Sequence, residues 1–215
     1  MDKRFLLILA ACAVLLGGLF VFTKDKSSTS SSSGNKSRLS NHVYGEGKSG
    51  VKLLEYGDFQ CPACGAYFPI VKEVKEKYKD QIYFQFRHFP LSQIHPNARA
   101  ASRSAEAAGK QGKFWEMHDM LYETQSSWEG SSAAVAIFES YAKQIGLNIQ
   151  KYKTDFASSE VNEIINADFA EGQKLGVEGT PTFYLEGKEI TEKPQDIEGF
   201  SKLIDQAIAN KAKKQ

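Results

Sequence analysis

The spacing of hydrophobic residues changes twice along this 215-residue chain. Residues 5–23, FLLILAACAVLLGGLFVFT, form an uncharged apolar run, and a helix needs roughly 20 such residues to cross the hydrocarbon core of a membrane. Residues 24–40 are mostly polar and rich in serine, without a hydrophobic period, as in flexible linkers. We therefore expect a transmembrane anchor at residues 5–23, a linker at residues 24–40 and one folded domain over residues 41–215.

The first part of this domain has a strand–helix–strand pattern. Residues 51–56, VKLLEY, form a short β-type run, and Pro62 stands where a helix would begin, a position that suits proline because its missing N–H costs nothing there. Hydrophobic residues continue at helical spacing to Lys79, and residues 81–89, QIYFQFRHF, alternate as in a strand. This order predicts two parallel strands joined by a right-handed crossover.

The rest of the domain is helical and then returns to strands. Residues 96–176 show helical spacing throughout, with Gly109 and Gly146 expected at helix ends and Asn148 and Ser159 at helix starts. Residues 182–190, TFYLEGKEI, predict a short hairpin, and residues 197–212 predict a last helix. The fold class is therefore α/β, with a helical insertion at about residues 92–176 between a βαβ half and a ββα half.

The net charge does not favour nucleic acid as a partner, although it leaves local basic patches open, and the charges say little about membrane topology. The formal net charge of +1 gives no electrostatic reason to bind nucleic acid. Basic residues stand on both sides of the apolar run, so the positive-inside rule barely discriminates, and the short flank favours residues 1–4 in the cytoplasm. The stretch LAAC ending at Cys12 is similar to a lipoprotein cleavage site, but the apolar run continues beyond it, which favours an uncleaved anchor.

The most informative motif is Cys61-Pro62-Ala63-Cys64. Cys61 precedes the expected helix, whose free N–H groups and dipole stabilise a negative charge, and the pKa of a cysteine there falls from about 8.5 to roughly 3.5–7.5. Cys64 lies one turn further on, so the pair can cycle between dithiol and disulfide through a mixed disulfide with a substrate. Cys61 would be the exposed attacking thiol and Cys64 the buried resolving thiol.

Three other roles compete for this pair. Structural zinc needs about four ligands, and the domain has no third cysteine and no ligand spacing among His42, His88, His95 and His118. We therefore expect no metal. An inert structural disulfide would gain little loop entropy, and two ordinary core cysteines are the third alternative.

A second motif, VEGTPTFYL at residues 177–185, favours redox chemistry. Pro181 stands just before a β run, where proline needs a special turn, and the Thr180–Pro181 bond is a realistic place for a cis peptide. A CxxC pair at a helix start combined with Gly-Thr-Pro-Thr-Phe before a late strand is far more specific than either motif alone.

These motifs, with LEYGDFQCPACG and GKFWEMHDMLYE, resemble the DsbA family of thiol–disulfide oxidoreductases over essentially the whole domain. The resemblance implies a thioredoxin fold with a helical insertion, no cofactor beyond the cysteine pair, a cis Pro181 beside the pair and a substrate paired with the backbone of Thr180. It also implies that Glu55 moves protons for Cys64; a partly exposed salt-bridge carboxylate is the alternative. Ala63 stands where the best-known members have a histidine that stabilises the thiolate. The oxidising strength of those members is therefore not assumed for this protein.

Two further polar residues have simpler explanations. Asp58 would influence the charge of the site or form a turn or cap beside it. His118 lies on the apolar face of its helix, where a core position is the simpler expectation than a catalytic one.

Together, these observations predict an enzyme held in the cell membrane by one helix, with its catalytic domain outside the cytoplasm, where disulfides are introduced. It would pass a Cys61–Cys64 disulfide to reduced secreted or surface proteins. The resemblance implies reoxidation by a quinone-linked membrane partner of DsbB or VKOR type. We expect a monomer, because no dimerisation region stands out. The alternatives are a disulfide reductase or isomerase of the same fold and, in a different class, a non-catalytic module that binds peptides beside Pro181.

Overall fold

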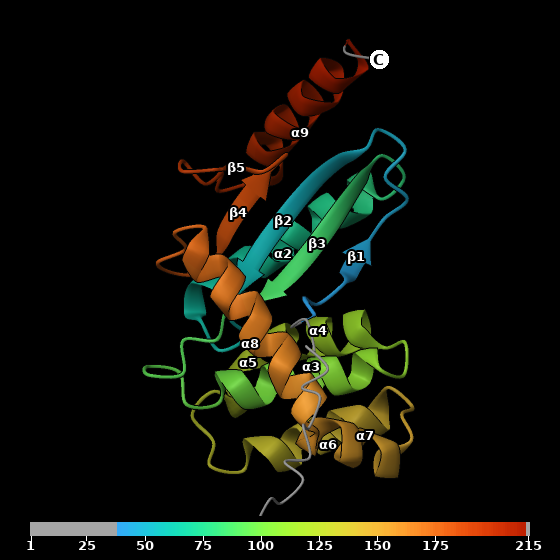
Figure 1. The fold of residues 1–215 in the computed structure, drawn as a ribbon, viewed down its shortest axis with the longest axis vertical. Coiled ribbons are helices and arrows are strands. Elements are labelled where there is room, and N and C mark those ends of the chain that lie inside the picture. The colour runs from blue at the N-terminus through green and yellow to red at the C-terminus, as the bar shows by residue number, and fades with distance from the viewer. Residues whose placement is uncertain (1–37, 214–215) are drawn as a thin grey trace, which may run out of the picture. The chain divides into compact units, whose positions relative to one another are not determined.

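The computed structural model describes residues 38–213, in which helices surround a mixed sheet (Figure 1). Its strands are β1 (His42–Tyr44), β2 (Val51–Gly57), β3 (Ile82–His88), β4 (Thr182–Leu185) and β5 (Lys188–Glu189). They lie in the order β1-β3-β2-β4-β5, with β2 and β3 parallel and the other neighbours antiparallel. The α/β class and the parallel pair are therefore confirmed.

The helices fall into three groups along the chain. They are α2 (Pro62–Tyr78), α3 (Ala98–Gly109), α4 (Phe114–Glu123), α5 (Gln125–Trp128), α6 (Ala134–Gln144), α7 (Ile149–Ala157), α8 (Ser159–Lys174) and α9 (Ile197–Ala212). Helix α2 connects β2 to β3, helices α3 to α8 form the insertion between β3 and β4, and α9 follows the hairpin. This is the expected thioredoxin-type layout.

The expected membrane anchor at residues 5–23 and Cys12 lie outside the described residues. Among residues 38–213, none of the helices combines the length and the apolar character needed to cross a bilayer.

The start of α2 and the turn of the hairpin follow simple local rules. Pro62 is at the start of α2, and Cys61 is its N-cap in an extended conformation. The hairpin turn lies at Glu186 and Gly187, whose φ values are both positive, 50° and 77°. Two-residue turns of this kind match the twist of the strands that they join, which explains why a glycine stands at the second position.

Some local expectations were wrong. Gly109 is the last residue of α3 rather than its cap, and the positive φ of 75° is at Gly112. Ser158, not Ser159, caps α8, because its hydroxyl accepts a hydrogen bond from the N–H of Val161 at 3.2 Å. The expectations for Gly146 and Asn148 were correct.

Strand β1 was not expected from the sequence. It has only three residues and pairs with β3 in the register His42 to Phe86. Three residues are too few to show a period, so its pairing depends on contacts with β3 rather than on its own pattern.

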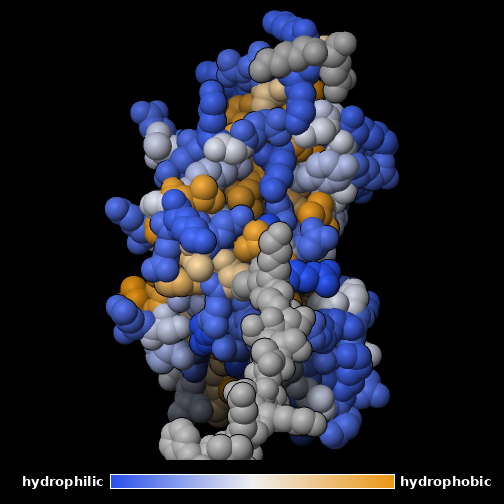
Figure 2. Space-filling view, viewed as in Figure 1, coloured by the Kyte–Doolittle hydropathy of each residue, from blue (hydrophilic) through white to orange (hydrophobic). Residues whose placement is uncertain are grey.

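Both faces of the sheet are covered. Phe183 of β4 packs against Phe200 of α9 with ring centroids 5.2 Å apart, and Phe89, just after β3, stacks on Phe169 of α8 at 4.5 Å. On the face drawn in Figure 2, hydrophobic side chains form small separate groups between hydrophilic ones. The carboxyl ends of β2 and β3 point toward the helices of the insertion (Figure 1), so the cysteine motif that follows β2 lies where the sheet meets the insertion.

Candidate active site

The loop between β2 and α2 is held by a buried carboxylate. Asp58 is fully buried, and its carboxylate accepts hydrogen bonds from the N–H groups of Gln60 at 2.8 Å and Leu91 at 2.9 Å. His95 Nδ1 lies 2.7 Å from the same carboxylate. The N–H of Cys61 donates to the carbonyl of Asp58 at 3.1 Å. Asp58 therefore has the turn-forming role, and it ties the cysteine motif to the loop after β3.

Cys61 lies against the proline motif from the other end of the domain. The expectation that Cys61 is exposed was wrong: the residue is only 6% exposed, because the proline motif packs against it. Its thiol donates to the carbonyl oxygen of Thr180 at 3.3 Å. The peptide bond between Thr180 and Pro181 is cis. Residues 119 positions apart in the sequence are thus brought together, as the two motifs required.

The environment of Cys61 favours its thiolate. The hydrogen bond from the Cys64 thiol contributes most, and the Thr180 side-chain hydroxyl and the backbone N–H groups of Cys64 and Ala63 add to it. Together they outweigh burial and lower the pKa of Cys61 to about 5. Ala63 and Cys64 are the second and third residues of the helix, whose N–H groups have no partner within it. These free groups and the helix dipole therefore favour a negative charge on Cys61, whose side chain makes no capping hydrogen bond of its own.

Cys64 has the opposite environment. It is 1% exposed, and burial, the hydrogen bond to Cys61 and the charge of Glu55 raise its pKa well above the ordinary value. At neutral pH the pair therefore holds one negative charge, on Cys61, and one proton, on Cys64. This is the division of roles expected for an attacking and a resolving thiol.

Glu55 of β2 lies opposite Phe183 of β4, and its charge acts on the Cys64 thiol. It is only 3% exposed, so the partly exposed salt-bridge alternative is wrong. Burial raises the pKa of Glu55 to about 8, against the opposing charge of Lys75. A carboxyl that titrates in this range can hold or release a proton near Cys64 at neutral pH.

The other two residues of the motif form its outer rim. Pro62 and Ala63 are both exposed. Ala63 contributes a backbone N–H to the thiolate but no side-chain charge, so the thiolate is stabilised without the histidine that stands there in the best-known DsbA proteins.

Three residues near the pair were missed from the sequence. Gln125 of α5 donates through Nε2 to the carbonyls of Phe59 at 2.7 Å and Cys61 at 3.0 Å, which fixes the backbone before the helix. Lys75 is 3% exposed, with its ammonium 4.4 Å from the ring centroid of Trp115. His95 holds Asp58 as described above. The position of Lys75 could have been predicted from the sequence, because it lies four residues after Val71 and therefore on the inner face of α2. No sequence pattern indicates that Gln125 or His95 lies near the pair.

His118 is a core residue, as expected. It is 1% exposed, its ring centroid lies 5.5 Å from that of Phe59, and its Nδ1 is 2.8 Å from Asp119. Burial lowers the pKa of His118 to about 4, although Asp119 acts to raise it. The ring is therefore neutral at physiological pH.

One cluster has the chemistry of a metal site although the sequence spacing showed none. His42 of β1, His88 of β3 and Glu106 of α3 place their ligand atoms within 4.8 Å of one another. One oxygen of Glu106 lies 2.6 Å from His42 Nε2 and 2.7 Å from His88 Nε2. These donors could hold a cation, but the hydrogen bonds between them already satisfy the buried carboxylate, and the cluster joins β1, β3 and the insertion in that form.

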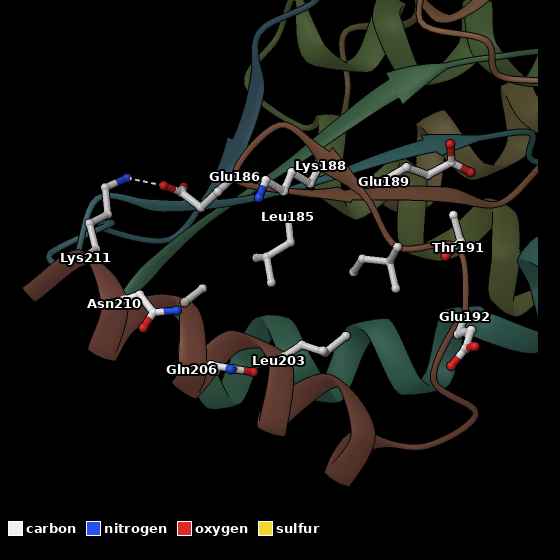
Figure 3. Close-up of a pocket in the computed structure, with 12 residues that line it drawn as sticks. Leu185, Glu186, Lys188, Glu189, Thr191, Glu192, Leu203, Gln206, Asn210 and Lys211 are labelled. Carbon is white, nitrogen blue, oxygen red and sulfur yellow. Dashed lines mark hydrogen bonds and ion pairs between the residues drawn. The ribbon is translucent and has the colours of Figure 1, made fainter.

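A cavity of about 730 Å3 lies between the β4–β5 hairpin and α9, apart from the cysteine motif (Figure 3). Leu185 and Leu203 line it, and an ion pair of 2.6 Å between Lys211 and Glu186 lies at one end. None of the site residues expected from the sequence lines this cavity. The cavity is therefore separate from the active site at the cysteine pair.

Comparison with known proteins agrees with this geometry. The sequence profile described as thioredoxin matches residues 37–206, and the chain belongs to that family. A solved thioredoxin-like oxidoreductase from Silicibacter pomeroyi DSS-3 superposes with a TM-score of 0.64 at 25% identity, covering 77% of this chain and 91% of that one. Wolbachia pipientis alpha-DsbA1 shares the fold with a TM-score of 0.68 at 19% identity, covering 84% and 98%. The chain is therefore a thioredoxin-family protein that shares the fold of the DsbA proteins.

Similar sequences also occur within larger proteins. A Na(+)/H(+) antiporter NhaA 1 from Salinispora arenicola is 34% identical over 168 residues, which is 78% of this chain and 25% of the antiporter. The chain spans about a quarter of the length of the curated relatives that it matches.

Proposed function

We propose that this protein introduces disulfides into secreted or surface proteins outside the cytoplasm. The observation that carries the proposal is the pairing of a thiolate at Cys61, set against Thr180 and the cis Pro181, with a buried, protonated Cys64 one turn away. A stabilised thiolate favours the dithiol form and therefore makes the disulfide form a stronger oxidant.

The reaction has two exchange steps. A substrate thiolate attacks the Cys61 sulfur of the Cys61–Cys64 disulfide, forming a mixed disulfide and releasing Cys64 as a thiolate that takes up a proton. A second substrate thiolate attacks the substrate sulfur of the mixed disulfide, and Cys61 leaves as a thiolate. The substrate loses two electrons and the protein gains them, with Glu55 placed to supply the proton for Cys64.

The proposal includes a place and two partners. Residues 5–23 would anchor the domain on the outer side of the cell membrane, and the clients would be reduced extracytoplasmic proteins. A quinone-linked membrane enzyme of DsbB or VKOR type would restore the disulfide, and an anchor would raise the effective concentration of the two partners. The domain would act as a monomer.

The experiment is a redox titration of the full-length protein, with Cys12 replaced by serine, in glutathione buffers. We expect a potential well above the roughly −270 mV of thioredoxin, toward the roughly −120 mV of DsbA. A potential at or below that of thioredoxin would assign the protein to the reductases. If the cysteine pair never cycles between dithiol and disulfide, the remaining hypothesis is a non-catalytic module that binds peptides. Cys61→Ser should not affect that binding.

A further inference from the structure

A groove of about 550 Å3 opens beside the active site between the loop after β3 and the end of α8. Residues 89–94 form one side, and Phe169 and Gln173 of α8 with Val177 and Glu178 form the other. Arg99 of α3 also lines it. The mechanism uses none of these residues.

Both sides of the groove are continuous with the active-site segments. Leu91 donates to the carboxylate of Asp58, whose carbonyl accepts from the N–H of Cys61. Val177 and Glu178 come immediately before Gly179 and Thr180 in the chain. A peptide paired with the backbone of Thr180 and continuing past Glu178 therefore enters the groove, because each extended residue advances it by about 3.3 Å.

The groove is partly open, and its lining combines hydrophobic side chains with polar ones. Ile94 is 70% exposed, which is the largest value for any large hydrophobic side chain in the described part of the chain. Leu91 and Phe169 are partly buried and pack against the cluster that contains Val177. A single exposed isoleucine is ordinary, but one that borders a hollow lined by hydrophobic residues indicates a binding surface.

A cation stands at the groove with neutral hydrogen-bond partners. Arg99 donates through Nη2 to the amide oxygens of Asn162 at 2.6 Å and Asn166 at 2.5 Å, and neither amide carries a charge to balance the guanidinium. Arg99 is partly buried, whereas Glu178 is exposed. A fixed and partly desolvated guanidinium binds a carboxylate more strongly than a solvated carboxylate binds a cation.

We propose that this groove binds the part of a substrate that neighbours its reacting cysteine, and that it selects an apolar side chain together with an acidic one. The apolar side chain lies against Ile94, Leu91 and Phe169, and the carboxylate pairs with Arg99. The inference rests on the proposed function, since it assigns a substrate preference to the same exchange reaction.

The experiment traps the mixed disulfide. The full-length chain carries Cys12→Ser and Cys64→Ser, so that Cys61 is its only thiol. Its equilibrium constant for a mixed disulfide is measured with two single-cysteine peptides and with glutathione. One peptide has leucine and aspartate on both sides of its cysteine; the other has serine and asparagine there. We expect the first peptide to be favoured roughly tenfold over the second, as burial of one apolar side chain allows.

The test variants are Ile94→Ser and Arg99→Gln in the same background. Each variant should remove most of the preference for the first peptide. Ile94→Ser removes the contact with the leucine of the peptide, and Arg99→Gln removes the ion pair with its aspartate. Matched controls are Val135→Ser, which removes another exposed hydrophobic residue, and Lys110→Gln, which removes a cation at the C-cap of the same helix that pairs with Glu160 outside the groove. Both controls should keep the preference.

Each outcome separates the two proposals. If Cys61 exchanges with glutathione but the peptides bind equally, or if the preference survives both test variants, the groove assignment is wrong and the proposed function stands. If Cys61 forms no mixed disulfide with any partner, both fail. Self-association that Ile94→Ser abolishes would assign the groove to a second copy of the chain and overturn the inference.

Discussion

Replacing Cys64 by alanine tests what keeps the Cys61 thiolate stable. The Cys64 thiol makes the largest favourable contribution to the pKa of Cys61, which is about 5. A hydrogen bond to a charged group contributes about 1.5–3 kcal/mol, and one pKa unit corresponds to about 1.4 kcal/mol. Loss of the thiol should therefore raise the pKa of Cys61 by about one to two units, to about 6–7.

The assay is the pH dependence of alkylation by iodoacetamide, with Cys12 replaced by serine in every chain. Only the thiolate reacts, so the midpoint of the rate profile gives the pKa of Cys61. Cys64→Ser is the matched control, because a hydroxyl still donates a hydrogen bond from nearly the same place. Its midpoint should stay near the value of the dithiol protein.

Two results would refute this reasoning. A midpoint near 5 in the alanine variant would mean that the helix N-terminus and Thr180 stabilise the thiolate without Cys64. Equal midpoints in the serine and alanine variants, both raised, would mean that the volume of the side chain matters and its hydrogen bond does not.

Three further predictions concern stability, each measured by denaturant unfolding. Burial raises the pKa of Glu55 to about 8 from an ordinary 4.5, so the free energy of unfolding of the parent should fall as pH rises between these values. Glu55→Gln should remove that slope and be about 2–5 kcal/mol more stable than the parent above pH 8. Equal slopes in the two proteins would contradict this. Burial acts to raise the pKa of Glu106, but hydrogen bonds from His42 and His88 lower it to about 2. The stabilisation by this carboxylate is therefore complete above pH 4.5 and lost as pH falls through about 2, and Glu106→Gln should flatten this acid limb, whereas an unchanged limb would count against the cluster. Phe138 is fully buried, so Phe138→Ala should cost about 3–5 kcal/mol, and a loss below about 1 kcal/mol would show that the insertion repacks around it.

Periodic segments were predictable because their patterns are local. The last helix was expected at residues 197–212 and is found at Ile197–Ala212. The crossover helix was also expected, since Pro62 and the spacing of its hydrophobic residues indicate it without knowledge of any partner. Strand β1 was missed for the opposite reason: its three residues are stabilised by β3, and no local pattern indicates such a partner.

The same division holds for the active site. Cys61, Cys64, Thr180 and Pro181 belong to two short motifs whose chemistry is local, and the fold brings them into contact. Lys75 and Gln125 reach the site through the packing of α2 and α5, and no motif contains them. The burial of Glu55 also depends on the layers above and below β2, so its pKa could not be read from the sequence.

The sequence alone determined the chemistry of the cysteine pair and the order of the main elements, because each follows from spacing within a few residues, and its motifs indicated the class of protein through their resemblance to a known family. The tertiary structure decided which thiol is ionised, how far the buried carboxyl is shifted and which surface lies beside the reacting sulfur. Those properties depend on desolvation and on contacts between distant segments, and only the folded chain brings these together.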